Sequence, residues 1–283
     1  MPIDRPIPLH VAQLLKQYGL WATKGLGQNF LDDPGLLQKI ADAAAISNSD
    51  VVLEVGPGLG SLTQFLCMRA QEVVAVELDQ RLTPALRSIL KPYRNVRIVE
   101  GDILALSPMD LQLPQGYIVA ANIPYNITSG LLRHLLSSDR RPQRIVLTVQ
   151  KEVAERICAS PPHMSLLALS VQVYGRPSIV GRIPAGAFFP VPKVDSAIVK
   201  IELFASPRIR EDLLSACFDL IKAGFSQKRK TLRNAMSAAL RLSPSDTEAL
   251  VSSAGIDSRR RAETLSLAEW EALGRQYVER SDH

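Results

Sequence analysis

Between residues 51 and 150, short apolar runs alternate with segments of helical periodicity, and no other feature of the chain restricts its fold so strongly. The apolar runs, several of them rich in β-branched residues, are typical of buried strands; they lie at 51–55, 73–78, 96–100, 117–122 and 144–150. Helical patterns separate them, for example at 83–90 and 130–136. Because alternating strands and helices form βαβ units, we expect a parallel sheet with helices on both faces.

Two later apolar runs, near 166–174 and 197–204, are predicted to complete a mostly parallel, seven-stranded sheet. After about residue 206 only helical patterns follow, with breaks at glycine, serine and proline; they cover 210–224, 228–241, 245–254 and 266–280. We therefore predict an α/β domain over 1–205, with an N-terminal extension at 1–30, and a small all-α domain over 206–283.

Composition sets limits on the kind of protein. The sequence has no uncharged apolar run of about 18 residues, which a membrane-spanning helix would need, and its N-terminus lacks the pattern of a secretory signal. Its three cysteines and four histidines are too scattered for a metal site or a disulfide framework. We expect a cytoplasmic monomer that binds neither metal nor membrane.

Positive charge is concentrated late in the chain. Residues 220–245 contain no Asp or Glu but carry six cations. These are Lys222, Lys228, Arg229, Lys230, Arg233 and Arg241. Solvated helix faces usually mix both signs, so this block favours a surface that contacts phosphates. The alternative is a cationic helix that only faces solvent.

The turn after the first strand has the sequence Glu54-Val-Gly56-Pro-Gly58-Leu-Gly60. Glycines let the backbone turn sharply and approach a ligand closely. The spacing is G-x-G-x-G, whereas dinucleotide-binding proteins have G-x-G-x-x-G. Pro57 also removes a backbone N–H that a pyrophosphate would use. The turn therefore favours a ligand without phosphates.

Acidic residues follow the next two predicted strands. Glu77 lies 21 residues after Gly56, where a carboxylate can accept hydrogen bonds from ribose hydroxyls. Asp102 ends the third strand and can accept one from the amine of an adenine ring. Each residue alone could be a turn or a cap. Together with the glycine turn, they predict a nucleoside pocket at the carboxyl edge of the sheet.

The fourth strand ends in Asn122-Ile-Pro124-Tyr125. The amine of adenine is a poor nucleophile because its lone pair is delocalised into the ring. Two acceptors, the Asn122 side-chain oxygen and the Pro124 carbonyl, could hold its two N–H groups and favour a pyramidal nitrogen. Tyr125 adds an aromatic face. The segment predicts methylation of an amine by orientation and electrostatics, without a strong base.

These features resemble the methyltransferases that use S-adenosylmethionine, and most closely the small-subunit ribosomal RNA adenine N6-dimethyltransferases of the KsgA/RsmA type. The similarity runs from about residue 14 to 275. Besides 122–125, it rests on blocks at 24–31, 150–156, 188–196, 227–234 and 261–266. The stretch 158–170 departs from the family, which usually has a glycine-rich segment there.

The resemblance implies a Rossmann-like class I methyltransferase fold and the role of each site residue. The cofactor pocket would be lined by Asn29, Leu31, Gly56, Gly58, Glu77, Asp102 and Asn122. The catalytic set would be Asn122, Pro124, Tyr125 and Phe188, with Phe188 stacked on a flipped adenine opposite Tyr125. RNA would be bound by Lys228, Arg229, Lys230 and Arg233.

The implied reaction is the N6,N6-dimethylation of two adjacent adenosines in the 3′-terminal hairpin of small-subunit rRNA. The implied partner is that rRNA within a 30S precursor particle. Two alternatives stay open: a large-subunit rRNA methyltransferase of the macrolide-resistance type, and a nucleic-acid-binding assembly factor without activity. The blocks 227–234 and 261–266 favour the small-subunit enzyme.

Overall fold

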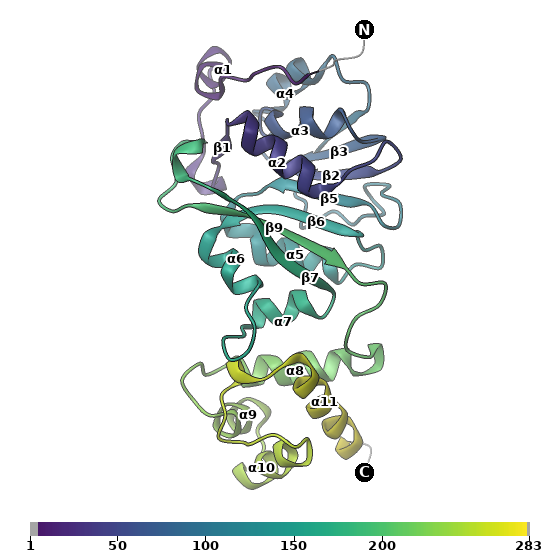
Figure 1. The fold of residues 1–283 in the computed structure, drawn as a ribbon, viewed down its shortest axis with the longest axis vertical. Coiled ribbons are helices and arrows are strands. Elements are labelled where there is room, and N and C mark those ends of the chain that lie inside the picture. The colour runs from purple at the N-terminus through teal and green to yellow at the C-terminus, as the bar shows by residue number, and fades with distance from the viewer. Residues whose placement is uncertain (1–4, 282–283) are drawn as a thin grey trace. The chain divides into compact units, whose positions relative to one another are not determined.

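The computed structural model describes residues 5–281, which form two compact units (Figure 1). One unit comprises the chain up to residue 154 together with 177–203, and the other comprises 155–176 and the chain from 204 onward. Residues 1–4 of the expected N-terminal extension, and 282–283 of the expected helical domain, lie outside the described residues.

The first unit is built on a seven-stranded sheet of order β4-β3-β2-β5-β6-β9-β7. The strands are β2 (Val51–Val55), β3 (Glu72–Glu77), β4 (Val96–Glu100), β5 (Ile118–Asn122), β6 (Arg144–Gln150), β7 (Gly175–Ile183) and β9 (Ser196–Leu203). The neighbours from β4 to β6 pair in parallel, and β9 pairs antiparallel to β6. The predicted mostly parallel, seven-stranded sheet is confirmed.

The parallel register brings the strand ends to one edge of the sheet. Val55 of β2 pairs with Val76 of β3, and Glu77 pairs with Glu100 of β4. On the other side of β2, β5 runs in the same direction and ends at Asn122. The turns that follow β2, β3, β4 and β5 are therefore neighbours in space, although they are far apart in sequence.

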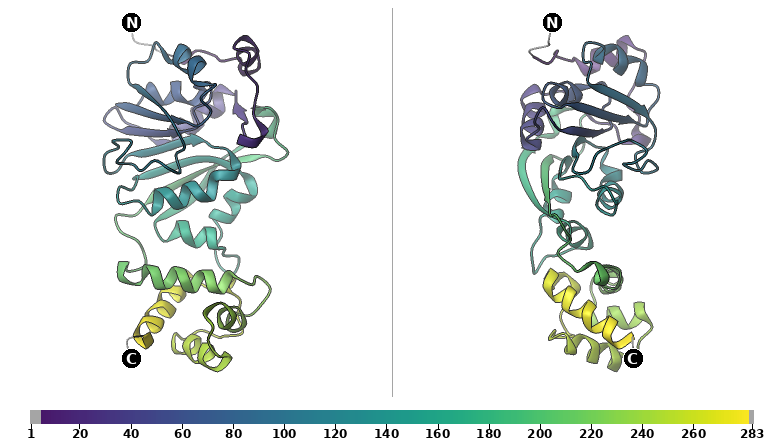
Figure 2. Two further views of the ribbon diagram at one scale, coloured as in Figure 1. Left: turned by 180° about the vertical axis from the view of Figure 1, so that it is seen from behind. Right: turned by 90° about the vertical axis from the view of Figure 1, so that its right-hand side faces the viewer.

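Helices cover both faces of this sheet (Figure 2). The helices of this unit are α1 (Val11–Gln17), α2 (Pro34–Ala44), α3 (Ser61–Cys67), α4 (Thr83–Leu90) and α5 (Thr128–Leu136), and α6 (Lys151–Ile157) begins in it and ends in the second unit. The side chain of Asp33 caps α2 by accepting a hydrogen bond from the Leu36 N–H, and Pro34 occupies its first turn. Together α2 and α3 bury one face of the sheet in a shared apolar core, and α5 lies on the opposite face.

A second, two-stranded sheet joins segments far apart in the chain. β1 (Phe30–Leu31) pairs antiparallel with β8 (Phe188–Phe189), with Phe30 opposite Phe189 and Leu31 opposite Phe188. It fastens the N-terminal segment to the connection between β7 and β9.

The second unit is helical. Its helices are α7 (Leu166–Gln172), α8 (Leu214–Phe225), α9 (Leu232–Leu240), α10 (Pro244–Ser253) and α11 (Leu267–Ser281). Its core surrounds Trp270, which is fully buried with Leu220, Ile221 and Met236. The all-α region expected after residue 206 is therefore present.

One predicted strand is wrong, because residues 166–172 form helix α7. The Ser165 side chain caps this helix by accepting a hydrogen bond from the Ala168 N–H, and Ala168 and Leu169 are fully buried in the core of the second unit. Periodicity alone does not separate a short buried helix from a buried strand. The seventh strand of the sheet is instead β7. Most of its residues are exposed, so its sequence has no apolar run by which it could have been predicted.

The same stretch changes the domain boundary. Residues 1–205 were expected in the α/β domain, whereas 155–176 lie in the helical unit. The Met164 N–H donates to the Glu263 carbonyl at 2.8 Å, and the Met164 side chain enters the helical core. These interactions join residues about 100 positions apart, so a local sequence pattern could not predict them.

Within the described residues, no helix is long and apolar enough to cross a membrane, and no cluster of three or more His, Cys, Asp or Glu side chains could hold a metal ion.

A tight helix crossing in the second unit gives a stability prediction. A Cβ atom added at Gly274 on α11 would overlap the Sγ atom of Cys217 on α8. Gly274→Ala should therefore lower the free energy of unfolding by about 1–3 kcal/mol through overpacking, although alanine favours the helix itself by about 1 kcal/mol. Adding Cys217→Ala removes the overlapping sulfur and should restore part of the loss. Urea unfolding of the single and double variants measures this; a Gly274→Ala protein more stable than wild type would refute the close crossing.

Candidate active site

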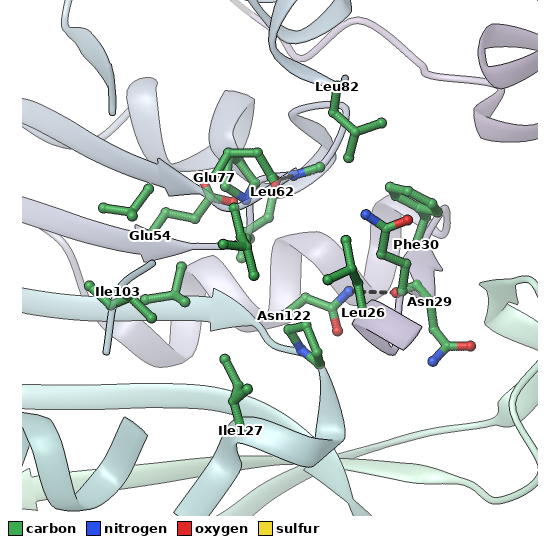
Figure 3. A pocket seen from close by; sticks show the side chains of 18 of the residues that line it. Leu26, Asn29, Phe30, Glu54, Leu62, Glu77, Leu82, Ile103, Asn122 and Ile127 are labelled. Atoms are coloured by element: carbon green, nitrogen blue, oxygen red, sulfur yellow. Dashed lines mark hydrogen bonds between the residues drawn. The ribbon is translucent and has the colours of Figure 1, made fainter. Parts of the chain in front are cut away.

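A pocket lies at the carboxyl edge of the sheet in the first unit (Figure 3). The turn after β2, the ends of β3, β4 and β5, and residues from 25 to 31 line it. All seven residues predicted to line a cofactor pocket are among its walls. They are Asn29, Leu31, Gly56, Gly58, Glu77, Asp102 and Asn122.

The glycine turn has the backbone shape that its sequence predicts. Gly56, Gly58 and Gly60 all have positive φ angles, of 68°, 60° and 86°, in a region that other residues rarely enter. At Gly58 a Cβ atom would lie 2.9 Å from the ring of Phe30. The turn needs glycine both for its conformation and because the N-terminal segment packs directly against it.

Glu77 is held rigidly at the end of β3. Its side chain is almost fully buried, Oε2 accepts from the Gly58 N–H at 2.9 Å, and Oε1 accepts from the Asp79 N–H at 2.8 Å. Burial raises the pKa of this carboxyl, and the backbone hydrogen bonds oppose the rise. Each oxygen keeps a further lone pair, so the group can still accept hydrogen bonds from a pair of ligand hydroxyls.

Asp102 follows β4 and is exposed at the pocket wall. Its Oδ1 accepts from the Leu104 N–H at 2.9 Å, which fixes the carboxylate and leaves Oδ2 for a ligand. Next to the two acids, the pocket walls are apolar. Leu78, which is 51 % exposed, and Ile103 each follow an acid in sequence and line the pocket. Neither was expected from the sequence, although their place beside the acids could have indicated them.

Glu54 is a second buried carboxyl in the pocket, on β2 beside Glu77 of β3 (Figure 3). Its side chain is 1 % exposed, and within residues 5–281 its Oε2 has no hydrogen-bond partner. Burial raises the pKa of Glu54 to about 8; Thr63 opposes the rise and the charge of Glu77 adds to it. Glu54 had no role among the residues expected from the sequence, because burial and missing partners are not visible in a motif.

Asn122 ends β5 with its amide in a fixed orientation. The Nδ2 group donates to the Asn29 carbonyl at 3.1 Å, across 93 residues of sequence (Figure 3). The Oδ1 atom is thereby left free to accept a hydrogen bond. Asn29 takes part through this carbonyl, since its own side chain donates back to the Gly27 carbonyl.

Two further predicted catalytic residues follow. The Pro124 carbonyl accepts from the Ile127 N–H at 3.3 Å and keeps a second lone pair. Tyr125 does not line the pocket; its hydroxyl is hydrogen-bonded to Ser196 Oγ at 2.7 Å, and burial raises the pKa of this phenol. Ser196 belongs to the 188–196 block, so the structure joins two motifs that are separate in the sequence.

Phe188 lies in the core. Its ring is 3 % exposed, it packs among the residues between α2 and the sheet, and it does not line the pocket. The side chain that β8 exposes is its neighbour Phe189, at 41 %. Stacking of Phe188 on a flipped base remains a prediction, and the ring offers no open face in this structure.

The N-terminal segment closes one side of the pocket. Gln28 lines the pocket and its Nε2 donates to Asp79 Oδ2 at 2.9 Å, just beyond the end of β3. Its Oε1 accepts from the Thr23 N–H at 2.8 Å. Gln28 belongs to the 24–31 block but was not expected at the site; its role depends on a hydrogen bond across 51 residues.

The basic residues lie in the second unit, and the prediction that they share a helix is wrong. Lys228, Arg229 and Lys230 are exposed in the turn between α8 and α9. The helix starts later because Thr231 caps α9, accepting from the Asn234 N–H. Arg233 does lie on α9, where it pairs with Glu248 at 3.0 Å.

The same turn lies beside a second basic segment. The N–H groups of Leu232 and Arg233 donate to the carbonyls of Arg260 and Ser258, at 2.7 and 3.1 Å. This places the start of α9 next to 258–261, where Arg259 is highly exposed, although it pairs with Asp257. The helical unit therefore gathers cations from two parts of the sequence.

Comparison with known proteins agrees with this geometry. The family described as "Ribosomal RNA adenine dimethylase" matches residues 21–276. The ribosomal RNA small subunit methyltransferase A of Dehalococcoides mccartyi is 46 % identical over 94 % of this chain and 92 % of that protein. The ribosomal RNA small subunit methyltransferase A of Moorella thermoacetica is 40 % identical over 95 % of this chain and 96 % of that protein.

Solved structures show the same similarity. A dimethyladenosine transferase from Plasmodium falciparum has a TM-score of 0.75 and 27 % identity, over 89 % of this chain and 98 % of that one. The 23S rRNA methyltransferase ErmE has a TM-score of 0.70 and 27 % identity, over 88 % and 99 %. The chain belongs to the ribosomal RNA adenine dimethylase family.

Proposed function

We propose that this protein uses S-adenosylmethionine to dimethylate the N6 amines of two adjacent adenosines in small-subunit rRNA. The observation that carries the proposal is the fixed amide of Asn122, whose free oxygen lies at a pocket lined by nucleoside-type acceptors. Membership of the family, and relatives named for the small subunit, support the same reaction.

The pocket fits a positively charged nucleoside. Within the described residues, its walls contain Glu54, Glu77 and Asp102 but no Lys, Arg or His. An anionic phosphate would be repelled there, whereas a cation is attracted. Buried Glu54 also has an oxygen without a partner, which a ligand can satisfy. When bound, S-adenosylmethionine supplies a methyl group activated by a sulfonium.

Different residues of the pocket recognise different parts of the cofactor. Glu77, held by two backbone N–H groups, accepts from the ribose hydroxyls without reorganising. Asp102 accepts from the adenine amine, and Leu78 and Ile103 give the ring apolar contacts. The glycine turn lets the backbone approach closely.

At the target base, Asn122 Oδ1 and the Pro124 carbonyl accept the two N–H groups of the amine. This favours a pyramidal nitrogen and directs its lone pair toward the methyl group. Tyr125, whose hydroxyl is hydrogen-bonded to Ser196, is the proposed aromatic partner of the target base, although its side chain does not line the pocket in this structure. The methylated amine is acidic enough to lose its proton to water, so no strong base is needed.

Selectivity must come from outside the pocket, because one adenine carries little sequence information. The exposed turn of Lys228, Arg229 and Lys230, with Arg259 nearby, can contact phosphates of a folded rRNA. We place the protein in the cytoplasm, acting as a monomer on a precursor of the small subunit. The large-subunit alternative is less favoured, since identity to ErmE is 27 % against 46 % to a small-subunit enzyme.

Glu77→Ala should weaken the binding of S-adenosylmethionine about 10- to 150-fold, corresponding to about 1.5–3 kcal/mol for a lost charged hydrogen-bond partner. Titration calorimetry on the purified variant measures the change. The control is Glu100→Ala. Glu100 lies opposite Glu77 at the end of β4 but does not line the pocket, so its removal should leave cofactor binding unchanged. Equal affinity of Glu77→Ala and wild type would remove Glu77 from the cofactor site.

Asn122→Ala should slow methyl transfer on the order of 100-fold, the scale for losing one oriented hydrogen-bonding group at a reacting centre, while RNA binding changes little. Single-turnover methylation at saturating cofactor and RNA separates the two effects. Asn126→Ala, which removes another amide from the pocket wall, is the matched control. A near-normal rate for Asn122→Ala would contradict the mechanism, whereas an inactive wild type would favour the assembly-factor alternative.

Changing Lys228, Arg229 and Lys230 together to Glu should abolish binding to small-subunit particles without affecting cofactor affinity. For each phosphate that the protein no longer neutralises, the slope of log K against log salt should fall by about 0.7–0.9. Lys222→Glu, on the α8 helix and paired with Asp219, is the control from the same unit. Tight particle binding by the triple variant would show that the turn only faces solvent, and preferential methylation of large-subunit particles would overturn the substrate.

A further inference from the structure

Glu54 combines burial, a missing partner and a place in the pocket wall. Its carboxyl is 1 % exposed, and among the described residues its Oε2 accepts no hydrogen bond. The proposed function counts Glu54 among the acids of the pocket wall but gives it no role in methyl transfer. A buried carboxylate without a partner is unfavourable, so such a group is either neutral or awaits a ligand.

In the part of the chain that the structure describes, no Lys, Arg or His lines the pocket beside Glu54. The neighbouring strand β3 contributes the carboxyl of Glu77, and α3 contributes the Thr63 hydroxyl and the Cys67 thiol. The other neighbouring strand, β5, has apolar Ile118 and Ala120 in the core on this side of the sheet. Burial and the charge of Glu77 therefore disfavour the negative form of Glu54, and the Thr63 hydroxyl opposes them.

We propose that Glu54 is a proton-linked cation site, which is neutral in the empty pocket and releases its proton when a positive group of the cofactor binds beside it. This rests on the proposed use of S-adenosylmethionine. The balance is simple: the cation binds, the O–H bond of the Glu54 carboxyl breaks, the proton goes to solvent, and the carboxylate pairs with the cation. No redox step and no further reactant are involved.

The direction of the link follows from burial. In the empty pocket burial raises the pKa of Glu54 to about 8, so the acid is mostly protonated at pH 7. A cation in contact with the carboxyl favours its charged form and lowers the pKa. Binding at pH 7 should thus release close to one proton, and the affinity should rise about tenfold per pH unit between pH 6 and 7.5.

The cofactor has two positive groups, a sulfonium and an α-ammonium, and both have the chemistry that the site requires. Three ligands distinguish them. S-adenosylmethionine carries both cations, S-adenosylhomocysteine keeps only the ammonium, and 5′-methylthioadenosine has neither. Proton release with the first two assigns the ammonium as the partner, and release with the first alone assigns the sulfonium.

The test is titration calorimetry of the full chain at pH 7, in buffers of different ionisation enthalpy. The dependence of the observed heat on the buffer counts the protons released. We expect close to one for wild type with S-adenosylmethionine and none with 5′-methylthioadenosine. Glu54→Gln, which mimics the neutral acid, should release none, and its affinity should be independent of pH from 6 to 7.5. Glu100→Gln, at the exposed end of β4, should behave as wild type.

The outcomes separate this proposal from the function on which it rests. Failure of S-adenosylmethionine to bind wild type would overturn the proposed function and the proton link together. Normal binding without proton release, equal release by Glu54→Gln, or release with 5′-methylthioadenosine would overturn the proton link alone.

A second measurement does not depend on any ligand. Since the folded-state pKa of Glu54 lies above its ordinary value of 4.5, its contribution to stability is full below that pH and is lost as the pH rises through about 8. Glu54→Gln should therefore lose less stability than wild type between pH 5 and 8.5 in urea unfolding. Identical pH profiles would show that Glu54 is already ionised in the empty pocket, and would contradict the proposal.

Discussion

Parallel pairing of β2 with both β3 and β5, and of β3 with β4, is the constraint on which the site depends. Parallel strands of matched register end at the same edge, so turns separated by 20 or more residues meet there. The glycine turn, Glu77, Asp102 and Asn122 lie at or just after the ends of four different strands, and the sheet brings them to one pocket. A shift of one residue in a single strand would turn its alternating side chains to the other face and remove its contribution.

Electrostatics then selects the ligand. Three carboxyls and no cation line the pocket within the described residues, and the glycine turn lacks the spacing that binds pyrophosphate. The acids differ in their surroundings: backbone N–H groups hold Glu77, a turn fixes Asp102, and Glu54 is buried with an unpaired oxygen. The same residue type can therefore serve in fixed recognition and, as we propose for Glu54, in a site that responds to charge.

Long-range interactions position the N-terminal segment and the catalytic amide. β1 pairs with β8, Phe30 packs against Gly58, and the Asn29 carbonyl fixes the Asn122 amide. The carbonyl that orients the proposed catalytic group thus belongs to a segment that also lines the proposed cofactor pocket. This gives a physical route by which cofactor binding and amine orientation can depend on each other.

The sequence by itself determined six of the seven strands, the glycine turn and the acids of the pocket, because strand periodicity, positive-φ glycines and acids at strand ends are local properties. Asn29 and Leu31 were expected at the pocket from the family resemblance alone. Only the tertiary structure decided that 166–172 is helical and joins the second unit, that Lys228–Lys230 form a turn, and that Tyr125 pairs with Ser196. It also decided that Phe188 is buried while Phe189 is exposed, and that Glu54 Oε2 has no hydrogen-bond partner among residues 5–281. Burial and hydrogen-bond partners depend on residues tens of positions apart, and the spacing within one motif carries no information about them.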